Sequence, residues 1–318
     1  DLDRRAADAP RLVLFADLDM NQIDRLNRVL WTTGWSWGPV LLRSERTRRA
    51  LAACGSRWAT GPQAPAVVSQ HLDQWRRNVT IATGRRPSDQ DLVMAARSYL
   101  RSVTESFVLP SWSPARIVSR VTTDPAGEQA LRAAMATRGA VVALPHIGSW
   151  DHAGAWACAT GMPVATVAEQ LGPAEFAAFK GFRERLGFRV YSPRDPTVLR
   201  ALTSDLRAGR LVCLVADRCL AGHGLVVGWP TPTGPVPVGI PAGPALLARQ
   251  TDALLVGVSA RFTPGGIHLA FSEPVEQRPG ARGLVTMTQQ LTDFFAAEVA
   301  LHPSDWHVFQ PFFTEEPR

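Results

Sequence analysis

Lysine is nearly absent from this chain of 318 residues, because Lys180 is the only one and arginine carries almost all of the positive charge. The formal net charge is +6 at neutral pH. Arginine favours planar, bidentate binding of phosphate or carboxylate groups, which suits an anionic membrane surface or a phosphorylated substrate. The sequence has no lysine-rich run and no aromatic RNA-binding signature, so we expect no nucleic-acid partner.

Several motifs of nucleotide, redox and hydrolytic enzymes are also missing. The absence of a P-loop and of a Rossmann glycine fingerprint removes support for nucleotide hydrolysis and dinucleotide redox chemistry. No Ser, Cys or Thr stands in a nucleophile-elbow context such as G-x-S-x-G. His223, His302 and His307 match no zinc spacing, so we expect no metal and no redox cofactor. The four cysteines form no C-x-x-C pair and are expected to be reduced thiols: Cys54, Cys158, Cys213 and Cys219.

Long apolar segments are lacking as well. No stretch reaches the roughly 18 apolar residues needed to cross a bilayer, and no secretory signal is visible. The nearest candidate, 29–42, carries Trp31, Trp35 and Trp37, which fits either a monotopic membrane contact or a pair of packed helices. We expect a cytoplasmic protein, and peripheral contact with the inner face of the plasma membrane stays open.

Strand-like and helix-like segments alternate along most of the chain. Ser88 and Asp91 form an N-cap signal before a helix that should stop at Leu109–Pro110. The alternation predicts an α/β fold with a central, mostly parallel or mixed sheet and helices on both faces. We treat 1–318 as one domain, with a helical N-terminal segment at 1–65 and an α/β core at 66–318. Strands are expected at 140–144, 163–168, 188–191, 211–216, 254–260 and 267–271, and helices at 127–138, 150–160, 176–186, 196–208, 242–251 and 284–300.

The segment ALPHIGSWD, residues 143–151, carries the clearest chemical signal. An apolar strand ends at Pro145 and delivers His146 and Asp151 at a strand-to-helix turn. Histidine has an ordinary pKa of about 6.5 and accepts a proton near neutral pH. A carboxylate one helical turn away can fix the tautomer of the ring. The simplest chemistry is a base that activates a substrate hydroxyl, although a structural turn histidine and a helix-dipole aspartate fit the same pattern.

Two further groups of charged residues follow predicted strands. Asp217 and Arg218 come directly after an apolar run, and Gly222 belongs to a glycine-containing segment that would let the backbone approach a ligand closely. A surface turn is the alternative for this pair. Glu169 ends another strand, and Arg183 lies on the polar face of the next helix. Arg183 could bind a phosphate, pair with Glu169 or simply be solvated.

Collinear segments from about Trp75 to Phe313 resemble one known family. They are QWRRN (74–78), SYLRSVTESFVLP (98–110), ALPHIGSWDHAGAW (143–156), TVAEQLGP (166–173), FRERLGF (182–188), LVCLVADR (211–218), IPAGPALLA (240–248) and HPSDWHVFQP (302–311). Together they look like the lysophospholipid acyltransferase superfamily, whose first motif is H-x-x-x-x-D/E. Within it the chain is similar to bacterial lipid A acyltransferases and, more closely, to actinobacterial phosphatidylinositol mannoside acyltransferases.

The resemblance implies a glycerolipid acyltransferase-like fold and an acyl-CoA-dependent O-acyltransferase. By this resemblance His146 is the general base, Asp151 is its orienting partner, and Asp217 is an acidic residue close to the histidine. The mannoside enzymes often have glutamate at that last position. The acceptor would be a hydroxyl of a glycolipid, first of all a phosphatidylinositol mannoside, and acyl-CoA would be a co-substrate.

The expected substrate contacts include the backbone. Donors for an oxyanion are expected near Gly148 or at the N-terminus of the following helix, and Arg183 and Arg218 are expected to bind substrate phosphates. The alternatives are an acyl-carrier-protein donor, a soluble alcohol or amine as acceptor, transfer to water, and a non-catalytic acyl-CoA- or lipid-binding homologue. The predicted substrate-binding residues are Gly148, Ser149, Glu169, Arg183, Arg218 and Gly222.

Overall fold

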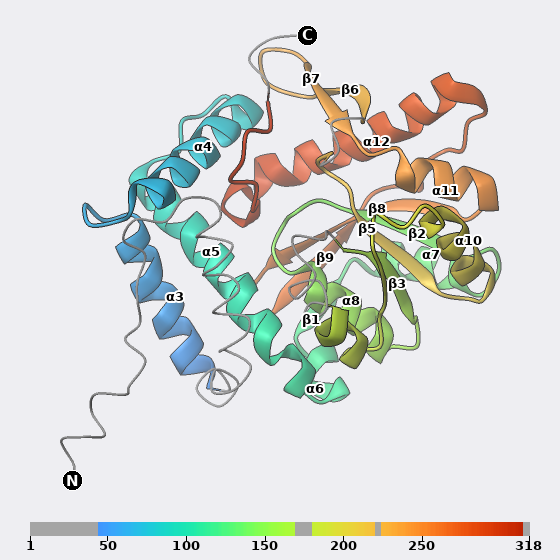
Figure 1. The fold of residues 1–318 in the computed structure, drawn as a ribbon, viewed down its shortest axis with the longest axis horizontal. Helices are drawn as coiled ribbons and strands as arrows, with labels where there is room; N and C mark the ends of the chain where they lie inside the picture. Colours follow the sequence, from blue (N-terminus) through green and yellow to red (C-terminus); the bar gives the residue numbers. More distant parts are fainter. Residues whose placement is uncertain (1–43, 169–179, 220–223, 314–318) are drawn as a thin grey trace.

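The computed structural model describes residues 44–168, 180–219 and 224–313. Its centre is a seven-stranded sheet in the order β1-β9-β8-β2-β5-β3-β4 (Figure 1). Neighbouring strands are parallel except β8 and β9, which are antiparallel. The predicted mostly parallel sheet is confirmed. The strands are β1 (Val121–Thr123), β2 (Ala140–Leu144), β3 (Val164–Val167), β4 (Arg189–Tyr191), β5 (Leu211–Val215), β8 (Leu254–Phe262) and β9 (Ile267–Phe271).

Helices cover both faces of this sheet, as predicted. The side chains of β2 show this, because they alternate between two apolar clusters. Val142 and Leu144 join the cluster that contains α7 (Pro125–Met135) and α8 (Trp150–Ala159). Val141 and Ala143 join the opposite cluster, to which three other helices contribute: α10 (Val198–Arg207), α11 (Gly243–Thr251) and α12 (Gly280–Leu301). All five β2 side chains are buried, as expected for a central parallel strand.

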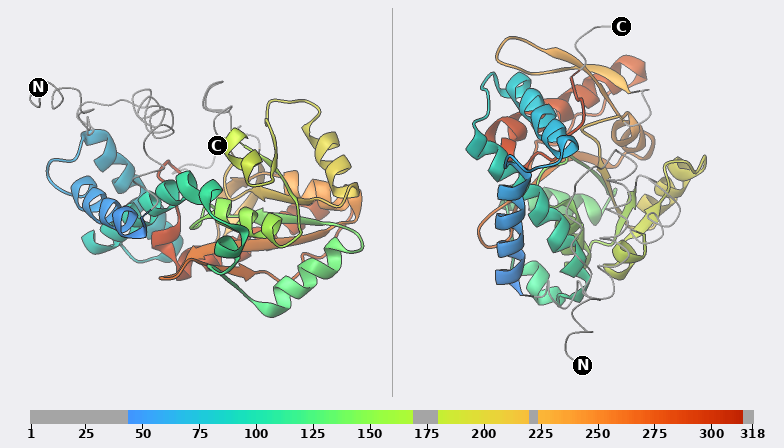
Figure 2. Two further views of the ribbon diagram at one scale, coloured as in Figure 1. Left: turned by 90° about the horizontal axis from the view of Figure 1, so that it is seen from below. Right: turned by 60° about the vertical axis from the view of Figure 1, so that its left-hand side comes forward.

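Three helices gather on one side of the molecule (Figures 1 and 2). They are α3 (Glu45–Ala59), α4 (Ala66–Thr83) and α5 (Asp89–Val108). The predicted start of α5 is confirmed, because Ser88 and Asp91 form a capping box. The helix ends before Leu109–Pro110, where the 3-10 turn η1 (Leu109–Ser111) leads to α6 (Pro114–Val118). The helix α5 also packs against a second 3-10 turn, η2 (Pro303–Asp305), near the C-terminus.

A small antiparallel hairpin lies apart from the main sheet and was not expected from the sequence. It consists of β6 (Leu225–Trp229) and β7 (Val236–Ile240). Glycine occurs inside both pairing segments and proline inside β7, for example Gly228 opposite Pro237, and such residues hide a strand signal. The hairpin packs on α12 and buries Trp229 completely in the core.

Of the predicted N-terminal segment 1–65, the structure describes only 44–65, and most of this part is α3. The tryptophan-containing stretch 29–42 lies outside the described residues. Among the described residues, no helix combines the length and the apolar character needed to cross a bilayer.

Candidate active site

His146 and Asp217 meet at the carboxyl edge of the sheet, where β2 and β5 end side by side. The parallel register pairs Leu144 with Val215, so each functional residue lies two positions beyond a paired residue. The imidazole Nδ1 of His146 contacts carboxylate Oδ1 of Asp217. The backbone N–H of His146 also donates to Oδ2 of the same carboxylate, at 2.9 Å. Asp217 therefore fixes both the ring and the backbone of the histidine.

The prediction that Asp151 orients the imidazole is wrong in this structure. Its carboxylate accepts from Nε of Arg183 at 2.7 Å and from the Ser106 hydroxyl at 3.3 Å. Asp151 lies in the first turn of α8, and that turn directs its side chain toward α5 and the helical segment that precedes β4. The spacing of five residues brought the two groups into one motif, but a strand end from elsewhere in the sequence supplies the partner of His146.

Asp217 lies in an enclosed polar environment rather than on a surface turn. The side chain is fully buried, and its Oδ2 also accepts from the indole Nε1 of Trp306 at 3.0 Å. Burial alone would raise the pKa of this carboxyl, but the charge and hydrogen bonds of His146 and the Trp306 indole outweigh it and lower the pKa. The carboxylate is therefore ionised at neutral pH and can hold a protonated Nδ1.

The turn that carries His146 is fixed by backbone contacts on both sides. The amide of Gly148 donates to the Asp305 carbonyl at 2.9 Å, and the amide of Ser149 donates to the Ala260 carbonyl at 3.0 Å. Gly148 has a φ of +62°, and an added Cβ would lie 2.0 Å from the Ala260 carbonyl oxygen. Gly148 is thus required by the turn, and its N–H is already used, which contradicts its predicted role as an oxyanion donor.

Ser149 is the N-cap of α8 and is almost entirely buried. Its hydroxyl accepts from the amide of His152 at 3.3 Å. This contact caps the helix, so the predicted substrate-binding role of Ser149 is not needed to explain the residue. Within the part of the chain that the structure describes, the amides of Trp150 and Asp151 have no hydrogen-bond partner.

The C-terminal segment 302–311 holds both residues of the site, Asp217 and His146, by hydrogen bonds. Besides the Trp306 contact to Asp217, the amide of His307 donates to the carbonyl of His146 at 2.8 Å. The helix α4 holds this segment in turn. The indole of Trp75 donates to the Trp306 carbonyl at 2.9 Å, and the buried Asn78 amide donates to the carbonyls of Val308 and Gln310. The sequence alone gives Trp306 no role, although the residue lies in the quoted motif HPSDWHVFQP.

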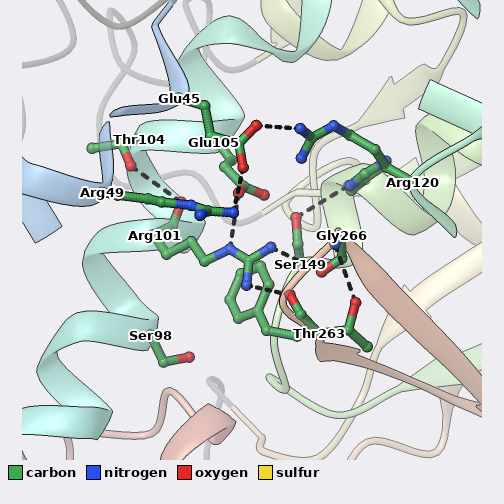
Figure 3. Close-up of polar contacts among 12 residues, drawn as sticks. Glu45, Arg49, Ser98, Arg101, Thr104, Glu105, Arg120, Ser149, Thr263 and Gly266 are labelled. Atoms are coloured by element: carbon green, nitrogen blue, oxygen red, sulfur yellow. Dashed lines mark hydrogen bonds and ion pairs between the residues drawn. The ribbon is translucent and has the colours of Figure 1, made fainter. Parts of the chain in front are cut away.

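The helix α5 is anchored to the β8–β9 turn by a polar network (Figure 3). The Arg101 guanidinium donates from Nε to Glu105 at 2.8 Å and from its two terminal nitrogens to the carbonyls of Thr263 and Gly266. It also lies over the Phe262 ring, 4.1 Å from the centroid. This anchoring sets the position of two α5 hydroxyls near the site, those of Ser98 and Ser106.

The remaining predicted contacts have mixed outcomes. Arg183 is largely buried in its ion pair with Asp151 and is not a solvated surface residue. Arg218 is partly buried and donates to the side chain of Gln310 at 3.3 Å. Glu169 and Gly222 lie outside the described residues, so their predicted roles are not addressed by this structure.

The family to which this chain belongs is shown by a sequence profile. The sequence profile described as "Bacterial lipid A biosynthesis acyltransferase" matches residues 43–315. The match covers most of the chain, so the protein belongs to this family and is an acyltransferase.

More specific similarity is found to individual relatives. A phosphatidylinositol mannoside acyltransferase of Mycolicibacterium smegmatis is 34% identical over 284 residues, which is 86% of this chain and 88% of the relative. A phosphatidylinositol mannoside acyltransferase of Mycobacterium tuberculosis is 32% identical over 288 residues, covering 88% and 87% of the two chains. The resemblance inferred from the sequence motifs is thereby confirmed.

Proposed function

We propose that this protein transfers a fatty acyl group from acyl-CoA to a hydroxyl of a glycolipid, with a phosphatidylinositol mannoside as the first acceptor to test. The names of the similar mycobacterial enzymes support the acceptor class. The contact between His146 and the buried carboxylate of Asp217 is the observation that supports general-base catalysis.

In this proposal His146 is the general base. Its Nδ1 is engaged by Asp217, while the side chain remains one-fifth exposed and Nε2 makes no hydrogen bond to a described residue. Nε2 takes the proton of the acceptor hydroxyl while that oxygen attacks the thioester carbonyl. The tetrahedral intermediate then collapses to the ester and expels the CoA thiolate, which takes up the proton from the imidazolium. General-base catalysis of this kind contributes roughly 10²–10⁴ in rate.

The oxyanion of the tetrahedral intermediate needs hydrogen-bond donors. The amides of residues 146 to 149 are all used within the turn and its contacts. We therefore assign the oxyanion to the amides of Trp150 and Asp151, the first two of α8, which also lie at the positive end of the helix dipole. The Trp150 ring meets the His146 ring edge to face, with 5.4 Å between centroids, so this helix start lies beside the base.

Other parts of the proposal concern substrate binding and location. Arg218 and Arg183 are proposed contacts for substrate phosphates, and Glu169 and Gly222 remain predicted substrate contacts. No metal or redox cofactor takes part in the proposed reaction. We place the enzyme in the cytoplasm, with peripheral contact at the anionic inner face of the plasma membrane.

The test is incubation of the purified protein with palmitoyl-CoA and an actinobacterial lipid extract, followed by mass spectrometry of the lipids. We expect palmitoylated phosphatidylinositol mannosides to accumulate, and to be lost with His146→Ala. His71→Ala is a matched control, because His71 lies on α4 and, among the described residues, its ring bonds only to the Val67 carbonyl of its own helix. If His146→Ala transferred the acyl group at the wild-type rate, His146 would not be the base.

Product analysis also separates the alternatives. Release of free fatty acid at the same rate with and without the lipid extract would indicate a hydrolase. Binding of palmitoyl-CoA without turnover would indicate a non-catalytic acyl-CoA-binding homologue. Transfer from acyl carrier protein, or to a soluble alcohol or amine in preference to the lipids, would change the donor or the acceptor but keep the base.

A further inference from the structure

The indole of Trp306 lies against the carboxylate of Asp217, and packing fixes its orientation. The Trp306 side chain is fully buried. The Trp229 ring stacks on it, with 5.7 Å between centroids and 20° between planes, and the Phe312 ring meets it edge to face at 5.0 Å. The backbone carbonyl of Trp306 accepts from the Trp75 indole at 2.9 Å. Ring and backbone are therefore both held, and the indole N–H is directed at Asp217.

This indole gives the carboxylate a hydrogen bond that His146 does not supply. Oδ1 of Asp217 contacts Nδ1 of His146, while Oδ2 accepts from the His146 amide at 2.9 Å and from Nε1 of Trp306 at 3.0 Å. Among the described residues, Trp306 is the one donor to this carboxylate other than His146 itself. A neutral N–H that bonds to a carboxylate stabilises its negative charge, so that charge attracts a proton on the neighbouring imidazole less strongly. The indole thereby lowers the proton affinity of the ring.

We propose that Trp306 is a positioning residue for the base: its N–H holds Asp217 against His146 and limits how strongly the imidazole binds a proton. The inference rests on the proposed function, in which that imidazole takes the proton of an acceptor hydroxyl. Trp306 is fully buried and touches no substrate, so it acts only through Asp217. The C-terminal segment thus contributes a third member to a pair that two strand ends bring together.

Other titratable groups near His146 do not produce this effect. His307 faces it from the C-terminal segment, but burial and the charge of His146 lower the pKa of His307 to about 3, so this second ring is neutral near pH 7. Burial raises the pKa of Asp305, whose carboxylate accepts from Ser98 on α5 and does not contact the base. The remaining charged groups nearby bond to other side chains: Asp151 to Arg183, and Arg218 to Gln310.

Substitutions of the two stacked tryptophans isolate the hydrogen bond. Trp306→Phe removes an N–H that bonds to Asp217. Trp229→Phe removes one from the neighbouring, equally buried ring, whose Nε1 has no hydrogen-bond partner among the described residues. With palmitoyl-CoA and a purified phosphatidylinositol mannoside, we expect Trp306→Phe to shift the acidic limb of kcat/KM upward by about one pH unit, the order of one hydrogen bond to a charged group. Trp229→Phe should keep the wild-type limb.

The same kinetics show whether Trp306 is only structural. KM for the acceptor should stay within about twofold in Trp306→Phe, because the indole makes no contact with substrate. Acidic limbs that coincide in both variants and the wild type, whatever the loss of kcat, would show that Trp306 only packs the core and would overturn the proposal. A raised KM with an unchanged limb would overturn it as well.

A titration of the unmodified protein depends neither on how the variants fold nor on a substrate. With ¹⁵N-labelled tryptophan, we expect the indole N–H signal of Trp306 to move as His146 takes up a proton, with its midpoint at the pH of the acidic limb. The Trp229 signal should stay fixed. A Trp306 signal that is constant over this range would contradict the proposal. Failure of the wild-type protein to acylate any hydroxyl, with a Trp306 signal that titrates, would instead refute the proposed function alone.

Discussion

Two aspartates near one histidine have different tasks, and the difference follows from which strand or helix carries them. Asp217 is fully buried and bonds to the imidazole, the His146 amide and the Trp306 indole. Asp151 is also buried but is neutralised by Arg183. Removing a carboxylate that pairs with a buried guanidinium destabilises the fold, whereas a carboxylate that pairs with a titratable ring can tune a base.

This distinction predicts different effects of the two amide substitutions. Asp217→Asn should lower kcat by about 10²–10⁴, because a neutral amide no longer favours the Nδ1–H tautomer or stabilises the imidazolium. Asp151→Asn should keep kcat within about tenfold but cost roughly 3 kcal/mol of stability, because it leaves Arg183 without its buried partner charge. Steady-state kinetics and urea unfolding of both variants check this. A larger kcat loss in Asp151→Asn would restore Asp151 as the partner of the base.

His307 predicts a pH dependence of stability. Burial, and to a lesser degree the charge of His146, lower the pKa of His307 from its ordinary 6.5 to about 3. Between these two values the unfolded chain binds a proton that the folded protein does not, so stability falls as the pH falls. From pH 7 to pH 5 this residue should cost the wild type about 2 kcal/mol, a loss that His307→Gln should not show. Urea unfolding at both pH values measures the difference, and equal losses would mean that the folded protein protonates the ring.

At the scale of elements, local sequence signals located most of the helices and strands. The capping box of α5 and the apolar strand β2 were expected within a few residues. The helix α4 was not expected, and neither was the β6–β7 hairpin, whose pairing segments are interrupted by glycine and proline. A turn can be recognised locally, but its contacts to β8 and to the C-terminal segment cannot, since those partners are more than a hundred residues away.

The turn between β2 and α8 predicts a steep effect at one glycine. Gly148→Ala combines a positive φ with a Cβ only 2.0 Å from a backbone oxygen, so it should cost about 3 kcal/mol or more and abolish activity. Gly161→Ala is the matched control, because Gly161 also has a positive φ but its Cβ would meet nothing within 4 Å. That variant should lose about 1–2 kcal/mol and keep its activity. Equal losses of stability would show that backbone strain, rather than the close approach to Ala260, is what requires Gly148.

At the scale of the whole molecule, the site depends on the strand order, which local sequence patterns do not predict. His146 and Asp217 were each identified as strand-end candidates, but their pairing required β2 and β5 to be neighbours. Similarly, the role of the QWRRN segment of α4 follows only from the fold, because Trp75 and Asn78 hold the C-terminal segment by hydrogen bonds to its carbonyls. Collinear motifs identified the family and thus the fold, whereas the contacts among the motifs come from three-dimensional packing.

The charge of the whole chain predicts how it meets lipid. The chain has a net charge of +6, and arginine supplies almost all of its positive charge, so it should be drawn to anionic bilayers at about 1 kcal/mol for each basic residue near the surface. We expect it to sediment with phosphatidylglycerol-containing vesicles at 0.1 M salt and to be released at 1 M, where the screening length falls from about 10 Å to about 3 Å. Vesicles of phosphatidylcholine alone are the control. Equal binding to both vesicle types, unaffected by salt, would mean that apolar insertion rather than arginine charge holds the protein at the membrane. No sedimentation with either type would favour an acceptor presented in solution.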